Sequence, residues 1–207
     1  LLARDRVTAS FVGDPSLRGT LDGWVDGFLG SMGEGGPRDE ESGFQPILET
    51  REGVATPAEV AFVATALPAV PEDHPDAPAL LLLSVHLSFG YLWNEVRVKR
   101  GAYGARAGYN SSNGMFGFSS YRDPCIRETL DTFQGAISHV IQDMDLSPAA
   151  MEQAIIGTVK SLDQPIRPAQ AVSMALSRHL REETAEHRKR FRQRSTGWSW
   201  WRSICGR

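Results

Sequence analysis

The sequence is poor in the side chains that build a catalytic or metal site by themselves. It has two cysteines, Cys125 and Cys205, and no CxxC pair. This argues against a disulfide framework and excludes a zinc site made of thiolates alone. The five histidines form neither HExxH nor HxxEH. A Ser/His/Asp arrangement stays open by composition, but no GxSxG motif supports one. Alone, the chain is predicted to hold no metal and shows no evident nucleophile.

The sequence also lacks an excess of positive charge and a membrane-length apolar run. Its net charge of −3 offers no electrostatic case for binding nucleic acid or an anionic membrane. The basic residues at 188–194 follow three glutamates at helical spacing, which predicts an exposed helix surface. The apolar run at 79–93 is short and interrupted by polar residues. We predict no nucleic-acid partner, no transmembrane segment, and a buried helix in which His86 is hydrogen-bonded.

A phosphate-binding loop is missing as well. Residues 33–43 (GEGGPRDEESG) are rich in glycine. They lack the GK[ST] ending of a phosphate loop, and their three consecutive acidic residues would repel phosphate. We therefore predict an exposed connector.

What is present is a mixed pattern of helices and strands. Hydrophobic residues make up 41% of the chain and charged residues 23%, as in ordinary folded domains. Alternation predicts strands at 6–12, 47–55, 59–67, 102–109 and 115–121, the last two as a hairpin. Helical spacing predicts helices at 17–32, 79–100, 123–141, 147–162 and 169–194, the last with a break near 182–184. This order predicts an α+β fold, an antiparallel sheet with helices packed on one face.

The stretch 92–104 (LWNEVRVKRGAYG) joins the apolar helix to the hairpin. Lys99 and Arg100 suit the last turn of a helix, and Gly101 stands where a helix commonly ends. This places Arg97 on the last helical turn and Tyr103 at the start of a strand. A guanidinium and a phenol at such a corner offer donors for a peptide carbonyl or a developing oxyanion.

Three stretches together carry a family resemblance. They are 92–104, 116–124 (FGFSSYRDP) and 128–130 (ETL). In these stretches the chain closely resembles the presequence protease branch of the pitrilysin-type inverzincins, and the flanking segments resemble the last domain of those enzymes.

The resemblance implies a large zinc peptidase whose four homologous α+β domains enclose a chamber for short unfolded peptides. In that family the zinc and the HxxEH motif belong to the first domain, so no cofactor is expected in this chain. The last domain contributes an arginine and a tyrosine, which match Arg97 and Tyr103. By resemblance, Arg97 binds a backbone carbonyl of the substrate and Tyr103 donates to the tetrahedral oxyanion. The implied partners are an unfolded peptide and the upstream catalytic domains.

Two departures from the family pattern stand close to these residues. Arg100 replaces a usual glycine, and Cys125 replaces the asparagine that usually follows Asp-Pro. An extra cation at 100 either changes the peptide preference or projects into solvent. Two alternatives to the peptidase hypothesis stay open, a catalytically inactive structural domain and a peptide-binding module that works alone.

The resemblance also predicts the domain limits. Residues 1–194 are expected to form one inverzincin-like domain that includes the loop 33–43. Residues 195–207, which contain three tryptophans, are expected to be a divergent, disordered tail or a membrane-interface anchor. We expect this chain to be a piece of a longer protein, and we find no targeting segment in the chain itself. The family suggests a mitochondrial or plastid location.

Overall fold

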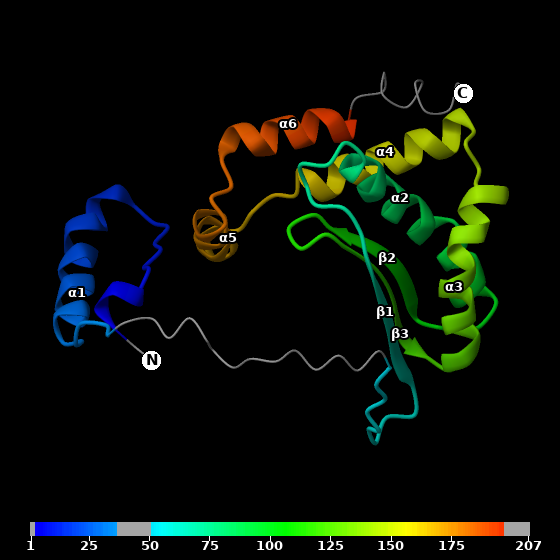
Figure 1. The fold of residues 1–207 in the computed structure, drawn as a ribbon, viewed down its shortest axis with the longest axis horizontal. Coiled ribbons are helices and arrows are strands. Elements are labelled where there is room, and N and C mark those ends of the chain that lie inside the picture. The colour runs from blue at the N-terminus through cyan, green and yellow to red at the C-terminus, as the bar shows by residue number, and fades with distance from the viewer. Residues whose placement is uncertain (1–2, 37–50, 197–207) are drawn as a thin grey trace. The chain divides into compact units, whose positions relative to one another are not determined.

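The computed structural model describes residues 3–36 and 51–196. The described chain falls into two compact units, which are treated separately below (Figure 1). The first contains Leu1–Ala55 and Pro165–Thr184, and the second contains Thr56–Gln164 and Ala185–Arg207. The prediction that residues 1–194 form one domain stays a prediction.

The first unit is helical wherever it has regular structure. It contains two 3₁₀ turns, η1 (Arg4–Arg6) and η2 (Pro15–Leu17), and the helices α1 (Arg18–Gly30) and α5 (Pro168–Leu180). Asp14 starts η2 by accepting a hydrogen bond from the backbone N–H of Ser16, as an N-cap residue does. The helix predicted at 17–32 is confirmed as α1. The predicted strand at 6–12 is wrong, because the described part of this unit offers no strand with which it could pair.

The second unit contains a three-stranded antiparallel sheet. Its strands are β1 (Ala61–Pro68), β2 (Gly104–Asn110) and β3 (Met115–Asp123), in the order β1-β3-β2. The predicted hairpin is confirmed, and Gly114 lies in its turn at a φ of +61°, which favours glycine. The predicted strand at 47–55 is absent from 51–55, and its residues 47–50 lie outside the described chain.

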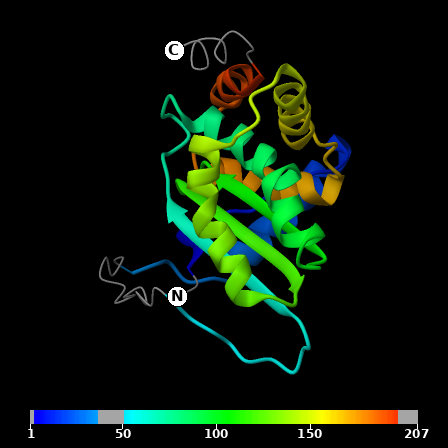
Figure 2. The same cartoon turned by 90° about the vertical axis from the view of Figure 1, so that its right-hand side faces the viewer.

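Two helices cover one face of this sheet. They are α2 (Ala77–Phe89) and α3 (Ile126–Gln142), and α3 crosses the sheet in Figure 2. The buried core joins strand residues to both helices, for example Phe118 to Leu87 of α2 and Phe133 of α3. The rings of Phe118 and Phe133 stack with their centroids 5.3 Å apart. The predicted α+β fold is confirmed.

Two further helices pack against α2 on its side away from the sheet. They are α4 (Pro148–Leu162) and α6 (Ala185–Thr196). Because α2 lies between them and β2, it is apolar around most of its circumference, as the sequence predicted. No helix in the described part of the chain combines the length and the apolar character that crossing a membrane requires.

The last predicted helix is divided as expected. It is interrupted between α5 and α6, where Glu182 has a φ of +55°. The helix α6 continues to Thr196, two residues beyond the predicted limit at 194. The predictions of a disordered tail or a membrane-interface anchor fall mostly on 197–207, outside the described residues.

Candidate functional site

The segment that carries Arg97 departs from regular α-helix. The sequence predicted one helix over 79–100, but α2 ends at Phe89, and Gly90 bends the backbone with φ −101° and ψ −91°. Residues Trp93–Val98 then form a π-helix, η3, in which the N–H of Lys99 donates to the carbonyl of Asn94 at 3.0 Å. Short π-helical turns are rare and occur frequently at functional sites.

A glycine turn connects this π-helix to strand β2. Gly101 has a φ of +80°, and its N–H donates to the carbonyl of Arg97 at 3.0 Å. The N–H of Ala102 donates to the carbonyl of Val96 at 3.3 Å, and both of these side chains are buried. The predicted glycine stop is confirmed. Because the turn is closed by backbone hydrogen bonds and anchored in the core, it holds Arg97 and Tyr103 on one rigid connection.

Arg97 is exposed and rests on an aromatic ring. Its guanidinium carbon lies 4.0 Å from the centroid of the Trp93 ring, a cation–π contact. Among the residues that the structure describes, its side chain has no hydrogen bond or ion pair. The contact with Trp93 steadies the side chain and leaves its N–H donors available to a ligand.

Tyr103 stands at the entrance of β2 and is 67% exposed. Its backbone N–H donates to the carbonyl of Arg122 at 3.3 Å, and its ring meets the ring of Tyr121 edge-on, with centroids 5.8 Å apart. Within the described part of the chain, its hydroxyl has no hydrogen-bond partner. The backbone and ring of Tyr103 are thus held in place, while its hydroxyl is available to a ligand.

The two departures from the family pattern lie against each other. Cys125 places its Sγ 4.0 Å from the carbonyl oxygen of Arg100. The guanidinium of Arg100 donates to the carbonyl of Glu95 and to the Thr132 hydroxyl of α3, the latter at 2.9 Å. Arg100 therefore does not project freely into solvent. These two hydrogen bonds connect η3 to α3 and so stabilise the segment that contains Arg97.

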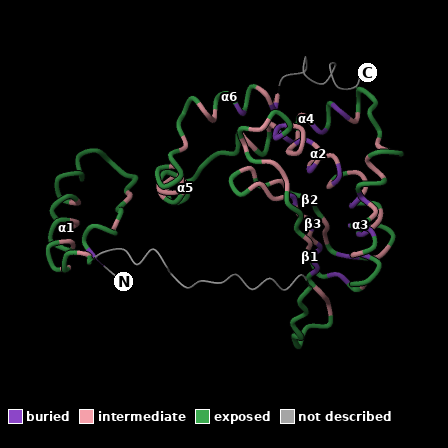
Figure 3. The backbone as a smooth tube through the Cα atoms, in the orientation of Figure 1, coloured by how far each residue is buried: buried purple, intermediate pink, exposed green. Residues whose placement is uncertain are grey.

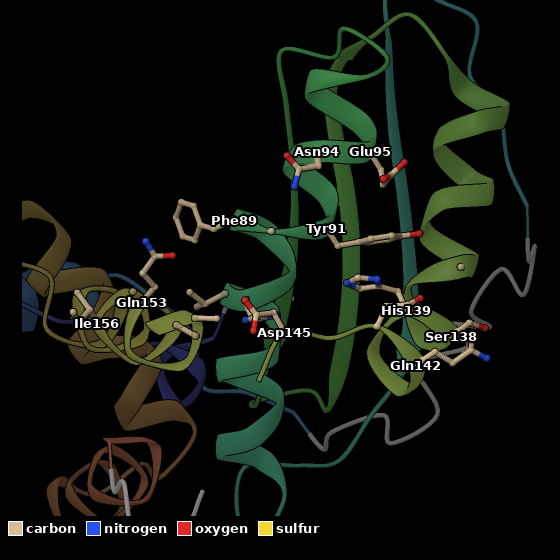
Figure 4. A pocket seen from close by; sticks show the side chains of 18 residues that line it. Phe89, Tyr91, Asn94, Glu95, Ser138, His139, Gln142, Asp145, Gln153 and Ile156 are labelled. Carbon is tan, nitrogen blue, oxygen red and sulfur yellow. The ribbon is translucent and has the colours of Figure 1, made fainter. Parts of the chain in front are cut away.

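One hollow in the second unit lies among α2, η3, α3 and α4 and has a volume of about 1000 Å³ (Figure 4). On one wall the Tyr91 ring stacks on His139, with centroids 4.3 Å apart. His86 also lines it, half-buried, and burial lowers the pKa of this imidazole. The expected hydrogen bond of His86 is missing among the described residues. Neither Arg97 nor Tyr103 lines this hollow.

Another hollow adjoins Tyr103 and has a volume of about 620 Å³. It lies over the sheet, and its largest lining side chains are Phe62, Arg106 and Tyr121, all of them exposed. The sequence analysis missed Phe62 and Arg106 as candidate site residues. Alternation along β1 and β2 could have placed them on one face, but only strand order brings them together.

A metal site was not expected in this chain. No group of three or more histidine, cysteine, aspartate or glutamate side chains lies close enough to hold a metal ion in the described ranges 3–36 and 51–196. The residues present there do not fit zinc, which takes three or four such ligands.

Comparison with known proteins places this part of the chain in a family. A family model described as the PreP C-terminal domain matches residues 51–199, a segment that includes Arg97, Tyr103 and the whole sheet.

Three curated relatives match between 54% and 74% of the chain. Presequence protease 1 of Arabidopsis thaliana, named chloroplastic/mitochondrial, is 32% identical over 142 residues, which are 69% of this chain and 13% of that protein. Protein HypA of Clostridium perfringens is 34% identical over 154 residues, 74% of this chain and 16% of its own length. The mitochondrial presequence protease of Saccharomyces cerevisiae is 36% identical over 112 residues, which are 54% of this chain and 11% of that protein.

The chain thus spans between 11% and 16% of the length of these relatives. The family model covers more than half of the chain. On this evidence, the chain belongs to the PreP C-terminal domain family, the last domain of presequence protease-like peptidases.

Proposed function

We propose that this chain is the substrate-side domain of a zinc metalloendopeptidase that degrades short unfolded peptides, such as cleaved targeting peptides. The observation that carries the proposal is the pair Arg97 and Tyr103. Both side chains are exposed, both lack a polar partner within the described residues, and one rigid connection presents both. Polar groups that a folded domain buries are normally hydrogen-bonded within it, whereas these two exposed groups stay available to a ligand.

Arg97 has the chemistry to hold the peptide backbone. Its planar guanidinium presents several donors in a fixed fork, and the Trp93 ring limits its motion. A carbonyl of an extended peptide accepts one or two of these donors. This contact positions the scissile bond, and correct positioning lowers the activation free energy of the reaction.

Tyr103 has the chemistry to stabilise the oxyanion. A neutral phenol donates a stronger hydrogen bond to a full negative charge than to a carbonyl oxygen, so its contribution grows as the tetrahedral intermediate forms. In a water-excluded chamber, such a donor lowers the barrier by a few kcal/mol. The Tyr103 hydroxyl, which has no partner among the described residues, suits this role.

The zinc of the parent enzyme belongs to a part outside this chain. The described residues provide no ligand cluster for it, and HxxEH is absent from all 207 residues. The proposed partners are therefore the upstream catalytic domains of the same enzyme and the unfolded peptide. In this arrangement the active site is divided between two parts of one enzyme.

Substitution of Arg97 and Tyr103 in the parent enzyme tests the proposal. Cleavage of a quenched unfolded peptide is expected to lose more than tenfold in kcat/KM with Arg97→Ala, a loss of about 1.4 kcal/mol or more in transition-state stabilisation. Tyr103→Phe removes only the hydroxyl and is expected to lower kcat on the order of a hundredfold. Lys99→Ala is the matched control, because Lys99 is a nearby cation already paired with Glu95 at 2.6 Å. An Arg97→Ala enzyme as fast as the Lys99→Ala enzyme would refute the assignment.

A second experiment distinguishes the peptidase hypothesis from the hypothesis that the chain is a peptide-binding module that works alone. The chain, the upstream domains and their mixture are each given the quenched peptide, with and without a metal chelator. Chelator-sensitive cleavage is expected only where both parts are present. Cleavage by the chain alone would show a catalytic centre within these 207 residues.

The names of the relatives support an organellar location. Two of the three carry mitochondrial or chloroplast names, and the third comes from a bacterium. For a eukaryotic parent of this chain, we expect the enzyme in the mitochondrial or plastid fraction of the cell. Its recovery in the cytosol would contradict this part of the proposal.

A further inference from the structure

The face of the sheet that α2 and α3 leave uncovered has an unusual surface. Three aromatic side chains gather there, at the end of the sheet near the entrance of β2. The Phe62 ring meets the Tyr121 ring edge-on with centroids 5.2 Å apart, and Tyr121 meets Tyr103 in the same way at 5.8 Å. Phe62 is 62% exposed and Tyr121 is 47% exposed. Large apolar side chains gathered on a surface commonly mark a binding site.

Glycine lies beside these rings on β2. Gly104 is paired with Tyr121 in the register of the sheet, and a Cβ built at Gly104 would meet no atom within 4 Å. The same holds at Gly108. Glycine within a strand costs stability and often occurs where another backbone approaches closely. The open space above Gly104 forms part of the hollow of about 620 Å³.

The exposed charges within the three strands have one sign. The three strands contain two arginines, Arg106 and Arg122, and a single acidic residue, Asp123. The carboxylate of Asp123 is buried and accepts hydrogen bonds from the Thr129 hydroxyl at 2.7 Å and from the Cys125 N–H at 2.9 Å. The exposed charges of the strands are therefore both positive, and they attract a carboxylate.

We propose that Phe62, Tyr121 and Gly104 form a subsite for a large apolar or aromatic side chain of the extended peptide, and that Arg106 and Arg122 favour an acidic residue next to it. This inference rests on the proposed function, because it gives that function a substrate preference. The subsite adjoins Tyr103 through the contact between the rings of Tyr103 and Tyr121. A peptide held by Arg97 and Tyr103 therefore has this surface within reach of its neighbouring side chains.

The chemistry of the surface selects this occupant. The edges of Phe62 and Tyr121 bind an apolar ring or a long aliphatic chain, and an aromatic pair changes affinity by about two- to tenfold. An exposed arginine adds a smaller preference for a carboxylate, which salt screens. A basic residue at the same place is repelled. The expected order of affinity is therefore aromatic with acidic, then alanine with acidic, then alanine with basic.

Direct binding tests the subsite without any catalytic step. Dye-labelled glycine- and serine-based peptides of about ten residues are titrated with the 207-residue chain, and dissociation constants are measured by fluorescence anisotropy at low and high salt. The peptides contain Phe-Ser-Asp, Ala-Ser-Asp, Phe-Ser-Lys or Ala-Ser-Lys at their centre. The Phe-Ser-Asp peptide is expected to bind about three- to tenfold more tightly than the Ala-Ser-Asp peptide. Its advantage over Phe-Ser-Lys is expected to shrink at high salt.

Matched variants assign this preference to the surface. Phe62→Ala is expected to remove the preference for phenylalanine, and Arg106→Gln the preference for aspartate. Phe89→Ala and Arg127→Gln are the controls, because Phe89 and Arg127 are exposed and lie on α2 and α3, outside the strands. Equal binding of the four peptides, no binding of any of them, or an unchanged preference in Phe62→Ala would overturn the subsite.

This outcome is separable from that of the proposed function. If Arg97→Ala leaves cleavage unchanged while Phe62→Ala removes the preference in binding, the substrate-arm assignment fails and the subsite stands. If Arg97→Ala slows cleavage while the four peptides bind alike, the subsite fails and the proposed function stands.

Discussion

The two faces of the sheet are built by the same three strands and serve different purposes. On the covered face, Phe116, Phe118 and Val63 pack with α2 and α3 into the core. Figure 3 shows buried stretches in the strands and in these two helices. On the open face, alternate positions of the strands hold Phe62 and Tyr121, which are exposed. Aromatic residues thus occur on both faces, but only those on the covered face are buried and so stabilise the fold. The comparison shows that an apolar residue in a strand identifies the core only when its own face is covered.

The largest expected contrast is between two phenylalanines, one on each face. Phe118→Ala leaves a cavity in the core, so it is expected to lower the free energy of unfolding by about 3–5 kcal/mol. Phe62→Ala removes an exposed ring, so it is expected to change that free energy by no more than about 0.5 kcal/mol. Urea unfolding of both variants, followed by circular dichroism, measures the difference. Similar losses in the two variants would mean that the open face is covered in solution.

A smaller contrast is expected between two neighbouring serines. The hydroxyl of Ser120 is buried and has no hydrogen-bond partner in the described part of the chain, whereas Ser119 lines the hollow on the open face. An unpaired buried hydroxyl is destabilising, so Ser120→Ala is expected to raise the free energy of unfolding by about 1 kcal/mol. Ser119→Ala is the control and is expected to leave it within about 0.5 kcal/mol. If Ser120→Ala instead lowers the free energy of unfolding, the Ser120 hydroxyl does form a hydrogen bond in the folded chain.

The smallest expected effect is on the pH dependence of stability and involves His86, which lies on α2. Burial lowers the pKa of His86 in the folded chain, with further influence from Asp145, which raises it, and His139, which lowers it. In the unfolded chain the imidazole titrates near its ordinary value of about 6.5. Below that pH the unfolded state binds more protons. Stability is therefore present above about pH 6.5 and is lost as pH falls through the lower pKa of the folded state.

Two variants test this pH dependence. In His86→Gln the loss of stability as the pH falls below about 6.5 is expected to be smaller than in the unchanged chain. His179→Gln is the control, because His179 is exposed on α5. Urea midpoints measured across this range give the comparison. If His86→Gln and the unchanged chain lose stability in parallel, burial of this imidazole is not the cause.

Local signals were sufficient for most of the second unit. Alternation predicted the hairpin of β2 and β3, and the glycine at 101 predicted the turn before it, because a φ of +80° is costly for other residues. Periodicity also predicted α3 and α4. The same signals failed at 6–12, where alternation alone cannot form a strand without a neighbouring one.

The sequence by itself determined the elements, the glycine turn, and the presence of Arg97 and Tyr103 on the connection between helix and strand. These follow from backbone preferences and spacing, which act over a few residues. Only the tertiary structure decided that Gly90 and η3 interrupt the helix, that Arg100 binds Thr132, and that Phe62 meets Tyr121. Each of these features depends on residues far apart in the chain or on how the helix packs. Strand order and packing, rather than local preference, therefore determined the surface around Tyr103.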